Sequence, residues 1–108
     1  RRWCRRHARA CCGPRELTVE CKTASNGRYA NGDFKVEVQK TRESGAGRKY
    51  TYNQFVIIAA CLFSATGLWE FRYRWSVDLE AWDQDPDRIK AVHRIDDTWV
   101  KSIGELLA

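Results

Sequence analysis

The stretch "LTVECKTASNGRYANGDFKVEVQKTR", residues 17–42, decides the fold predicted for this chain. Two segments in it alternate between apolar and polar residues, which is the period of a strand with one buried face. Asn-Gly pairs at 26–27 and 31–32 lie between the two segments and are typical of turns. The stretch therefore predicts a β-hairpin over about residues 16–41. The residues expected to face the core are Leu17, Val19 and Cys21 in the first strand and Phe34, Val36 and Val38 in the second.

The polar side chains of this hairpin suggest chemistry. If both apolar faces share one core, the polar residues share the opposite face, because a one-residue slip would invert a whole strand. Directly opposed residues on that face would lie about 5 Å apart. Two carboxylates and a lysine in such a group favour a Mg²⁺ site, since Mg²⁺ is held by one or two carboxylates, water and substrate phosphate. Ordinary solvated charges on the outer face are the alternative. The residues expected there are Glu20, Lys22, Glu37 and Gln39.

Charge is distributed unevenly along the 108 residues. Residues 1–50 hold 13 Lys and Arg against 5 Asp and Glu, whereas residues 51–108 hold 6 against 9. Nucleic acid is the commonest partner of such a basic half, because cations that neutralise phosphates release counterions. A solvated basic surface is the alternative. In the glycine-containing loop after the hairpin, we expect the nucleic-acid backbone to contact Lys40, Arg42, Arg48 and Lys49.

The segment after this loop predicts a buried helix over about residues 51–66. Thr51 and Gln54 have the spacing of a capping box, and a nearly continuous apolar run follows them. Gly67 then stands where a helix C-terminus favours glycine. A helix of this kind would pack against the apolar face of the hairpin.

Two further elements complete the predicted α+β domain, which spans residues 16–108 around a central mixed or antiparallel sheet. The sequence "LWEFRYRW", residues 68–75, alternates aromatic and charged side chains and predicts an aromatic strand. Its aromatic face is expected to belong to the core, although four rings in a row could also stack on bases. Residues 97–107 place apolar side chains at helical spacing and predict an amphipathic C-terminal helix. His93, between these elements, is expected to be structural or exposed.

The first 15 residues, "RRWCRRHARACCGPR", contain six arginines and no Val, Ile, Leu or Phe, and we expect a basic N-terminal arm. The five cysteines of the chain are irregularly spaced, which disfavours a disulfide scaffold. Zinc is the alternative to free thiols in the arm, but no second ligand pair completes a tetrahedral site. No apolar run is long enough for a membrane span, so we expect a soluble, cytoplasmic protein without membrane association. The zinc candidates would be Cys4, His7, Cys11 and Cys12.

At Glu20 and Lys22 the text "LTVECKTAS" resembles the Glu-x-Lys strand of the PD-(D/E)XK nucleases, the restriction-endonuclease-like superfamily. The order of segments over residues 16–75 is also similar to that of small members of this superfamily. The resemblance implies Mg²⁺-dependent hydrolysis of nucleic-acid phosphodiesters, with Glu20 and Glu37 as metal ligands. Lys22 would stabilise charge on the phosphate and Gln39 would position water or phosphate.

The resemblance allows two alignments. In the first, Glu20 and Lys22 are the Glu and Lys of the motif, and the metal-binding Asp should lie upstream, where residues 1–19 contain no Asp. In the second, Glu20 replaces that Asp, and Glu37 with Gln39 replaces the Glu-x-Lys pair. The missing Asp leaves open a truncated or degenerate copy without activity.

Two other functions compete with the nuclease hypothesis. The basic hairpin and loop could bind nucleic acid, or an acidic protein, without chemistry. Alternatively, an exposed tryptophan face including Trp75 could mediate self-association, for example as a homodimer. Glycine-rich phosphate loops, nucleophile elbows, H-E-x-x-H pairs and dinucleotide fingerprints are absent from the sequence, which disfavours those enzyme classes.

Overall fold

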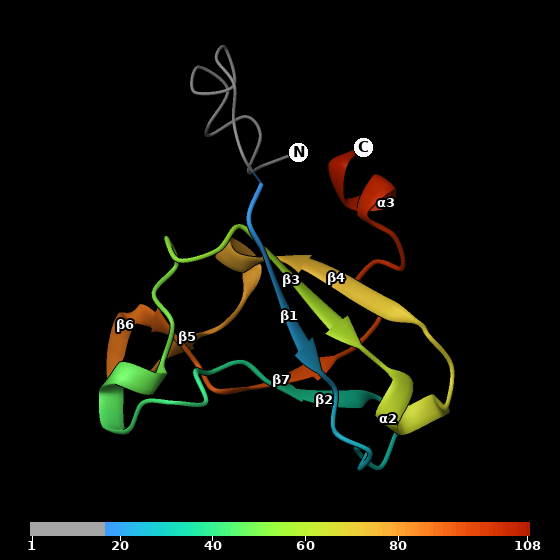
Figure 1. Ribbon diagram of the computed structural model, residues 1–108, viewed down its shortest axis with the longest axis horizontal. Helices are drawn as coiled ribbons and strands as arrows, with labels where there is room; N and C mark the ends of the chain where they lie inside the picture. Colours follow the sequence, from blue (N-terminus) through green and yellow to red (C-terminus); the bar gives the residue numbers. More distant parts are fainter. Residues whose placement is uncertain (1–16) are drawn as a thin grey trace.

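The computed structural model describes residues 17–108, and within them it shows an α+β fold of short strands and helices (Figure 1). The predicted arm, residues 1–15, and the zinc candidates in it lie outside the described residues. No helix in residues 17–108 is long and apolar enough to cross a membrane. The elements are β1 (Val19–Thr23), β2 (Phe34–Glu37), η2 (Gly45–Arg48), β3 (Ile57–Cys61), α2 (Phe63–Thr66), β4 (Phe71–Trp75), η3 (Ser76–Asp78), β5 (Ala81–Trp82), β6 (Asp85–Ile89), β7 (Val92–Ile95) and α3 (Ile103–Leu107).

The predicted hairpin of β1 and β2 is wrong, because the two strands belong to different sheets. β1 lies parallel to β3, and β4 completes this sheet antiparallel to β3. β2 instead pairs antiparallel with β7. Antiparallel contact between the two predicted hairpin strands is confined to the tip, where Ser25 N donates to Lys35 O at 2.8 Å and Arg28 forms a bridge with Phe34. The turn signal at Asn31 and Gly32 is confirmed, since Gly32 has a φ of 93° that favours glycine.

The predicted helix over residues 51–66 is also wrong, and its apolar run forms the central strand β3. All five residues of β3 are buried, because the sheet is covered on both faces. A strand covered on both faces shows no alternation, so the run alone cannot distinguish it from a buried helix. The capping-box residues do form a contact, in which Thr51 N donates to Gln54 Oε1 at 2.8 Å, but it closes a turn. Gly67, with a φ of 77°, ends the short helix α2.

The main core lies between the β1–β3–β4 sheet and the β2–β7 pair, which Figure 1 shows running across the lower ends of β1 and β3. Val36 and Val38 face Ile58 and Ala60 in this core, and burial of such side chains stabilises the fold by about 1.5–3 kcal/mol each. A second cluster on the other face of the sheet contains Ile57, Trp75 and Leu106. The two layers thus explain why β3 is apolar throughout.

The aromatic strand is confirmed as β4, and its last ring enters the core. Trp75 is 1% exposed, so the predicted tryptophan face for self-association cannot include it. Trp69, by contrast, precedes the strand, is 75% exposed and stacks on Phe63 with ring centroids 4.4 Å apart. Self-association as a homodimer stays a prediction.

The C-terminal helix is present but shorter than predicted. It begins after Ser102, whose Oγ accepts a hydrogen bond from Glu105 N at 3.1 Å. The residues before it are held in other ways, since Trp99 is buried in the main core and Val100 forms a bridge with Tyr73.

Candidate nucleic-acid interface

Glu20 and Lys22 lie beside each other on β1, on the face opposite to the one predicted. Lys22 is only 16% exposed, whereas Val19 is 45% exposed. The contacts of the lysine ammonium group explain this, because the group lies 5.4 Å from the Tyr50 ring centroid and donates to Gln39 O at 3.0 Å. The Glu20 carboxylate lies 3.7 Å from the same ammonium. The structure therefore brings Glu20, Lys22 and the main chain of Gln39 together.

Glu37 does not join this group. Its neighbours Val36 and Val38 are fully buried, so the alternation of β2 directs the exposed Glu37 side chain away from the core. Glu20 is in register with buried Ile58, and its side chain leaves β1 toward that core. By this alternation the two carboxylates extend to opposite sides of β2, which does not support the predicted convergence of Glu20 with Glu37.

These residues do not fit the Mg²⁺ site that the nuclease resemblance implies. Strand alternation directs Glu37 away from the core, and Glu20 is already paired with Lys22. Across residues 17–108 no cluster of three or more His, Cys, Asp and Glu side chains is arranged to hold a metal ion.

The four predicted phosphate-binding residues belong to one basic loop, residues 40–49. The loop is closed at its base by two hydrogen bonds, from Lys40 N to Arg48 O at 2.8 Å and from Arg48 Nε to Lys40 O at 3.0 Å. A bridge between Gln39 and Lys49 continues this pairing. Arg42 is exposed in the loop, and Lys40 Nζ lies 3.6 Å from Glu43. The loop therefore holds the four cations on one short, hydrogen-bonded segment.

A groove of about 670 Å³ runs between this loop and the turn after β5, and we call it the Trp82 groove. Lys49 crosses the indole of Trp82, with its ammonium 4.4 Å from the ring centroid. No Asp or Glu lines the groove, so its charge comes from the two cations Arg48 and Lys49. The lining residues are Gln39, Gly45, Ala46, Arg48, Lys49, Trp82, Gln84 and Ala91.

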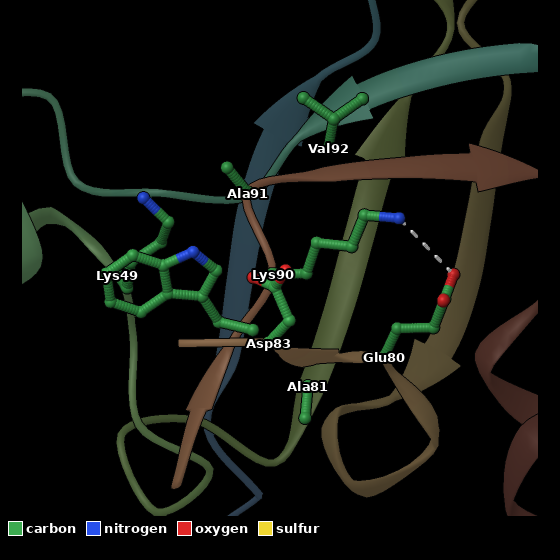
Figure 2. Close-up of a pocket in the computed structure, with 8 residues that line it drawn as sticks. Lys49, Glu80, Ala81, Asp83, Lys90, Ala91 and Val92 are labelled. Atoms are coloured by element: carbon green, nitrogen blue, oxygen red, sulfur yellow. Dashed lines mark ion pairs between the residues drawn. The ribbon is translucent and has the colours of Figure 1, made fainter. Parts of the chain in front are cut away.

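A second cleft, of about 490 Å³, shares Lys49 and Trp82 with the Trp82 groove but has a different charge. Figure 2 shows Lys49 at one end of this second cleft and the ion pair of Lys90 with Glu80 at the other. The two charged groups of that pair lie 3.8 Å apart. Asp83 adds another carboxylate to the lining. The groove side of Trp82 thus carries two uncompensated cations, whereas the two cations and two carboxylates of the cleft side balance each other.

His93 is structural, as one of the two predicted alternatives states. It is 4% exposed, and its Nε2 lies 2.6 Å from Lys90 O. Burial lowers the pKa of this histidine, and the hydrogen bond to the Lys90 carbonyl offsets part of that effect.

Trp82 is the residue of this interface that the sequence did not single out. Trp82 is the last residue of the short strand β5. Its partner Lys49 lies 33 positions earlier in the chain, and no residue near Trp82 in the sequence indicates this contact. The residues that follow, Asp83 and Gln84 in the turn and Asp85 and Pro86 at the start of β6, are a signal only for chain reversal. No family model, no curated protein sequence and no solved structure matches this chain.

Proposed function

We propose that this protein is a nucleic-acid-binding module that holds its ligand through the phosphate backbone and does not cleave it. The basic loop supplies the contacts, with Lys40, Arg42, Arg48 and Lys49 as the phosphate-binding residues. The single observation that carries the proposal is the Trp82 groove, which joins Arg48 and Lys49 to an aromatic ring without any lining carboxylate.

The distribution of charge supports the same proposal. The basic half of the chain contains the whole loop, and cations elsewhere in the chain also lie over aromatic rings. Arg94 is 3.9 Å from the ring centroid of Tyr29, and Arg28 is 4.2 Å from that of Phe34. Cations and aromatic rings interleaved on a surface are what a polyanion with flat bases binds best.

The rival proposal is the Mg²⁺-dependent nuclease. The proximity of Glu20 and Lys22 favours it, because a Glu-x-Lys strand needs these two side chains together. A second carboxylate ligand is what it lacks, since Glu37 extends to the other side of β2. We therefore place binding without cleavage first.

The binding proposal is tested by fluorescence anisotropy with labelled oligonucleotides at several salt concentrations. Replacing Arg42 or Lys49 by alanine should weaken binding and reduce the slope of log affinity against log salt by about 1 for each phosphate that is no longer neutralised. Lys101→Ala, which removes an exposed cation far along the chain from the loop, is the matched control and should change neither value. Equal effects of all three variants, or no binding by the wild type, would refute the proposal.

A further inference from the structure

Trp82, the last residue of β5, lies beside the basic loop and lines a groove at the surface. Its indole is half-buried and lines both the Trp82 groove and the second cleft, so a flat ligand can reach the ring from the surface. The ammonium of Lys49 lies over the ring, 4.4 Å from its centroid, and so would be adjacent to a ligand that stacks on the indole. Aromatic stacking and a cation are therefore available at one point.

The main chain that carries this cation is held in place by the fold. The Lys49 main chain is held on one side by the bridge to Gln39 and on the other by Arg88, whose Nη1 donates to Lys49 O at 2.8 Å. Trp82 itself is carried by β5, which pairs with β6. Groups held by strands and hydrogen bonds lose little freedom when a ligand binds, so more of the interaction free energy appears as affinity.

The net charge differs between the two sides of Trp82. Phosphate is attracted to Arg48 and Lys49 in the Trp82 groove, whereas in the second cleft the carboxylates of Glu80 and Asp83 balance the ammonium groups of Lys49 and Lys90. A nucleotide strand would thus run along the groove side and present a base to the indole. Bases of a duplex are stacked on each other and cannot do this, whereas the bases of a single strand can.

We infer that Trp82 is a stacking site for an unpaired nucleobase and that this protein selects single-stranded over double-stranded nucleic acid. The inference rests on the proposed function and names its substrate class. The strand contacts Arg48 and Lys49 with its phosphates while one base stacks on Trp82. Base-to-ring stacking does not depend on sequence, so the selectivity is for strandedness.

The test uses the full chain and two fluorescein-labelled probes, a mixed-sequence single strand of about 12 nucleotides and the duplex of the same sequence. Trp82→Ala should weaken binding of the single strand by about 5- to 150-fold, which corresponds to the loss of one stacked base. Binding of the duplex should stay within about 2-fold, because its contacts are to phosphate only. Trp82→Phe should restore most of the single-strand affinity.

Two further variants keep the result interpretable. Trp82→Leu retains apolar packing without an aromatic face, and should bind the single strand as weakly as the alanine variant if stacking is the cause. Trp69→Ala is the matched control, because Trp69 is an exposed tryptophan stacked on Phe63 outside the groove. It should bind both probes like the wild type. Thermal unfolding of each variant identifies any that fails to fold.

The outcomes separate the inference from the function on which it rests. Binding of both probes by the wild type with equal affinity, unchanged by Trp82→Leu, would overturn the inference and leave the binding module intact. The inference would also be overturned, with the binding module intact, if Trp82→Leu and Trp82→Phe weakened the binding of both probes equally. Binding of neither probe by the wild type would overturn both proposals. Loss of single-strand affinity in Trp82→Leu with recovery in Trp82→Phe supports the inference.

Discussion

The ammonium of Lys22 donates a hydrogen bond of 3.0 Å to the main-chain oxygen of Gln39. This contact joins β1 of one sheet to the segment that leads from β2 into the basic loop. The nuclease resemblance predicts that both residues act on a phosphodiester. In the structure, the lysine side chain meets the glutamine backbone, an arrangement that anchors the loop to the core.

Replacing Lys22 by methionine tests this anchoring role. Methionine retains most of the aliphatic stem but leaves Gln39 O without its charged donor, so the free energy of unfolding should fall by about 1–2 kcal/mol. Urea unfolding measures the change. Lys101→Met, at an exposed position, should be neutral. An unchanged midpoint for Lys22→Met would argue that the hydrogen bond adds nothing to stability.

Glu20→Gln and Glu37→Gln together distinguish binding from cleavage. We expect the wild type to leave supercoiled plasmid intact in the presence of Mg²⁺, and we expect Glu37→Gln to unfold like the wild type, because its side chain is exposed. Agarose electrophoresis over several hours is the measurement. Mg²⁺-dependent nicking that disappears in both variants would restore the two-carboxylate hypothesis.

The burial of His93 predicts that stability depends on pH. Its pKa is lowered mainly by burial, so the unfolded chain binds a proton more readily than the folded protein. The stabilisation is complete above the ordinary histidine pKa of about 6.5 and is lost as pH falls below it. The urea midpoint should therefore drop between about pH 7.5 and about pH 5.

His93→Gln removes this titration and should flatten the profile over the same interval. The interval ends above the range in which Asp96 titrates, since the hydrogen bond from the Thr98 hydroxyl lowers the pKa of that carboxyl. An equally steep profile in His93→Gln would assign the effect to other groups.

Gly67 and Gly27 form a matched pair for testing backbone conformation. Gly67 ends α2 with a φ of 77°, whereas no positive φ occurs at Gly27. Alanine at 67 should therefore lower the free energy of unfolding by about 1 kcal/mol. Alanine at 27 would meet only an ordinary contact of 3.6 Å with Ser25 Oγ and should be close to neutral. Equal midpoints in thermal unfolding would contradict the assignment.

How far the sequence predicts this fold depends on how local each signal is. The turn at Gly32, the helix end at Gly67 and the alternating strand β4 all follow from a few adjacent residues, and all three are confirmed. The partner of β1 does not follow from adjacent residues. Val19 and Glu20 alternate in the same way whichever strand lies beside them, so pairing with β3 rather than β2 is invisible in the pattern.

The candidate site shows the same division. The cations of residues 40–49 stand out because they are close in sequence, and the loop does bring them together. The face on which Glu20 and Glu37 lie depends on which layer each strand joins, and Lys22, whose ammonium lies over the Tyr50 ring, is on the opposite face from the one expected for β1. Trp82 enters the site only through contacts between distant segments, so no local pattern marks it.

The parallel pairing of β1 with β3 also bears on how the chain is made. Thr18 and Val56, whose contact begins the pairing, are 38 residues apart. At about 5–20 residues per second, a nascent β1 waits roughly 2–8 seconds for its neighbour to be synthesised. During that time its apolar and unpaired backbone groups are open to chaperones and to other nascent chains. An unpaired strand of this kind is a template on which another chain can pair.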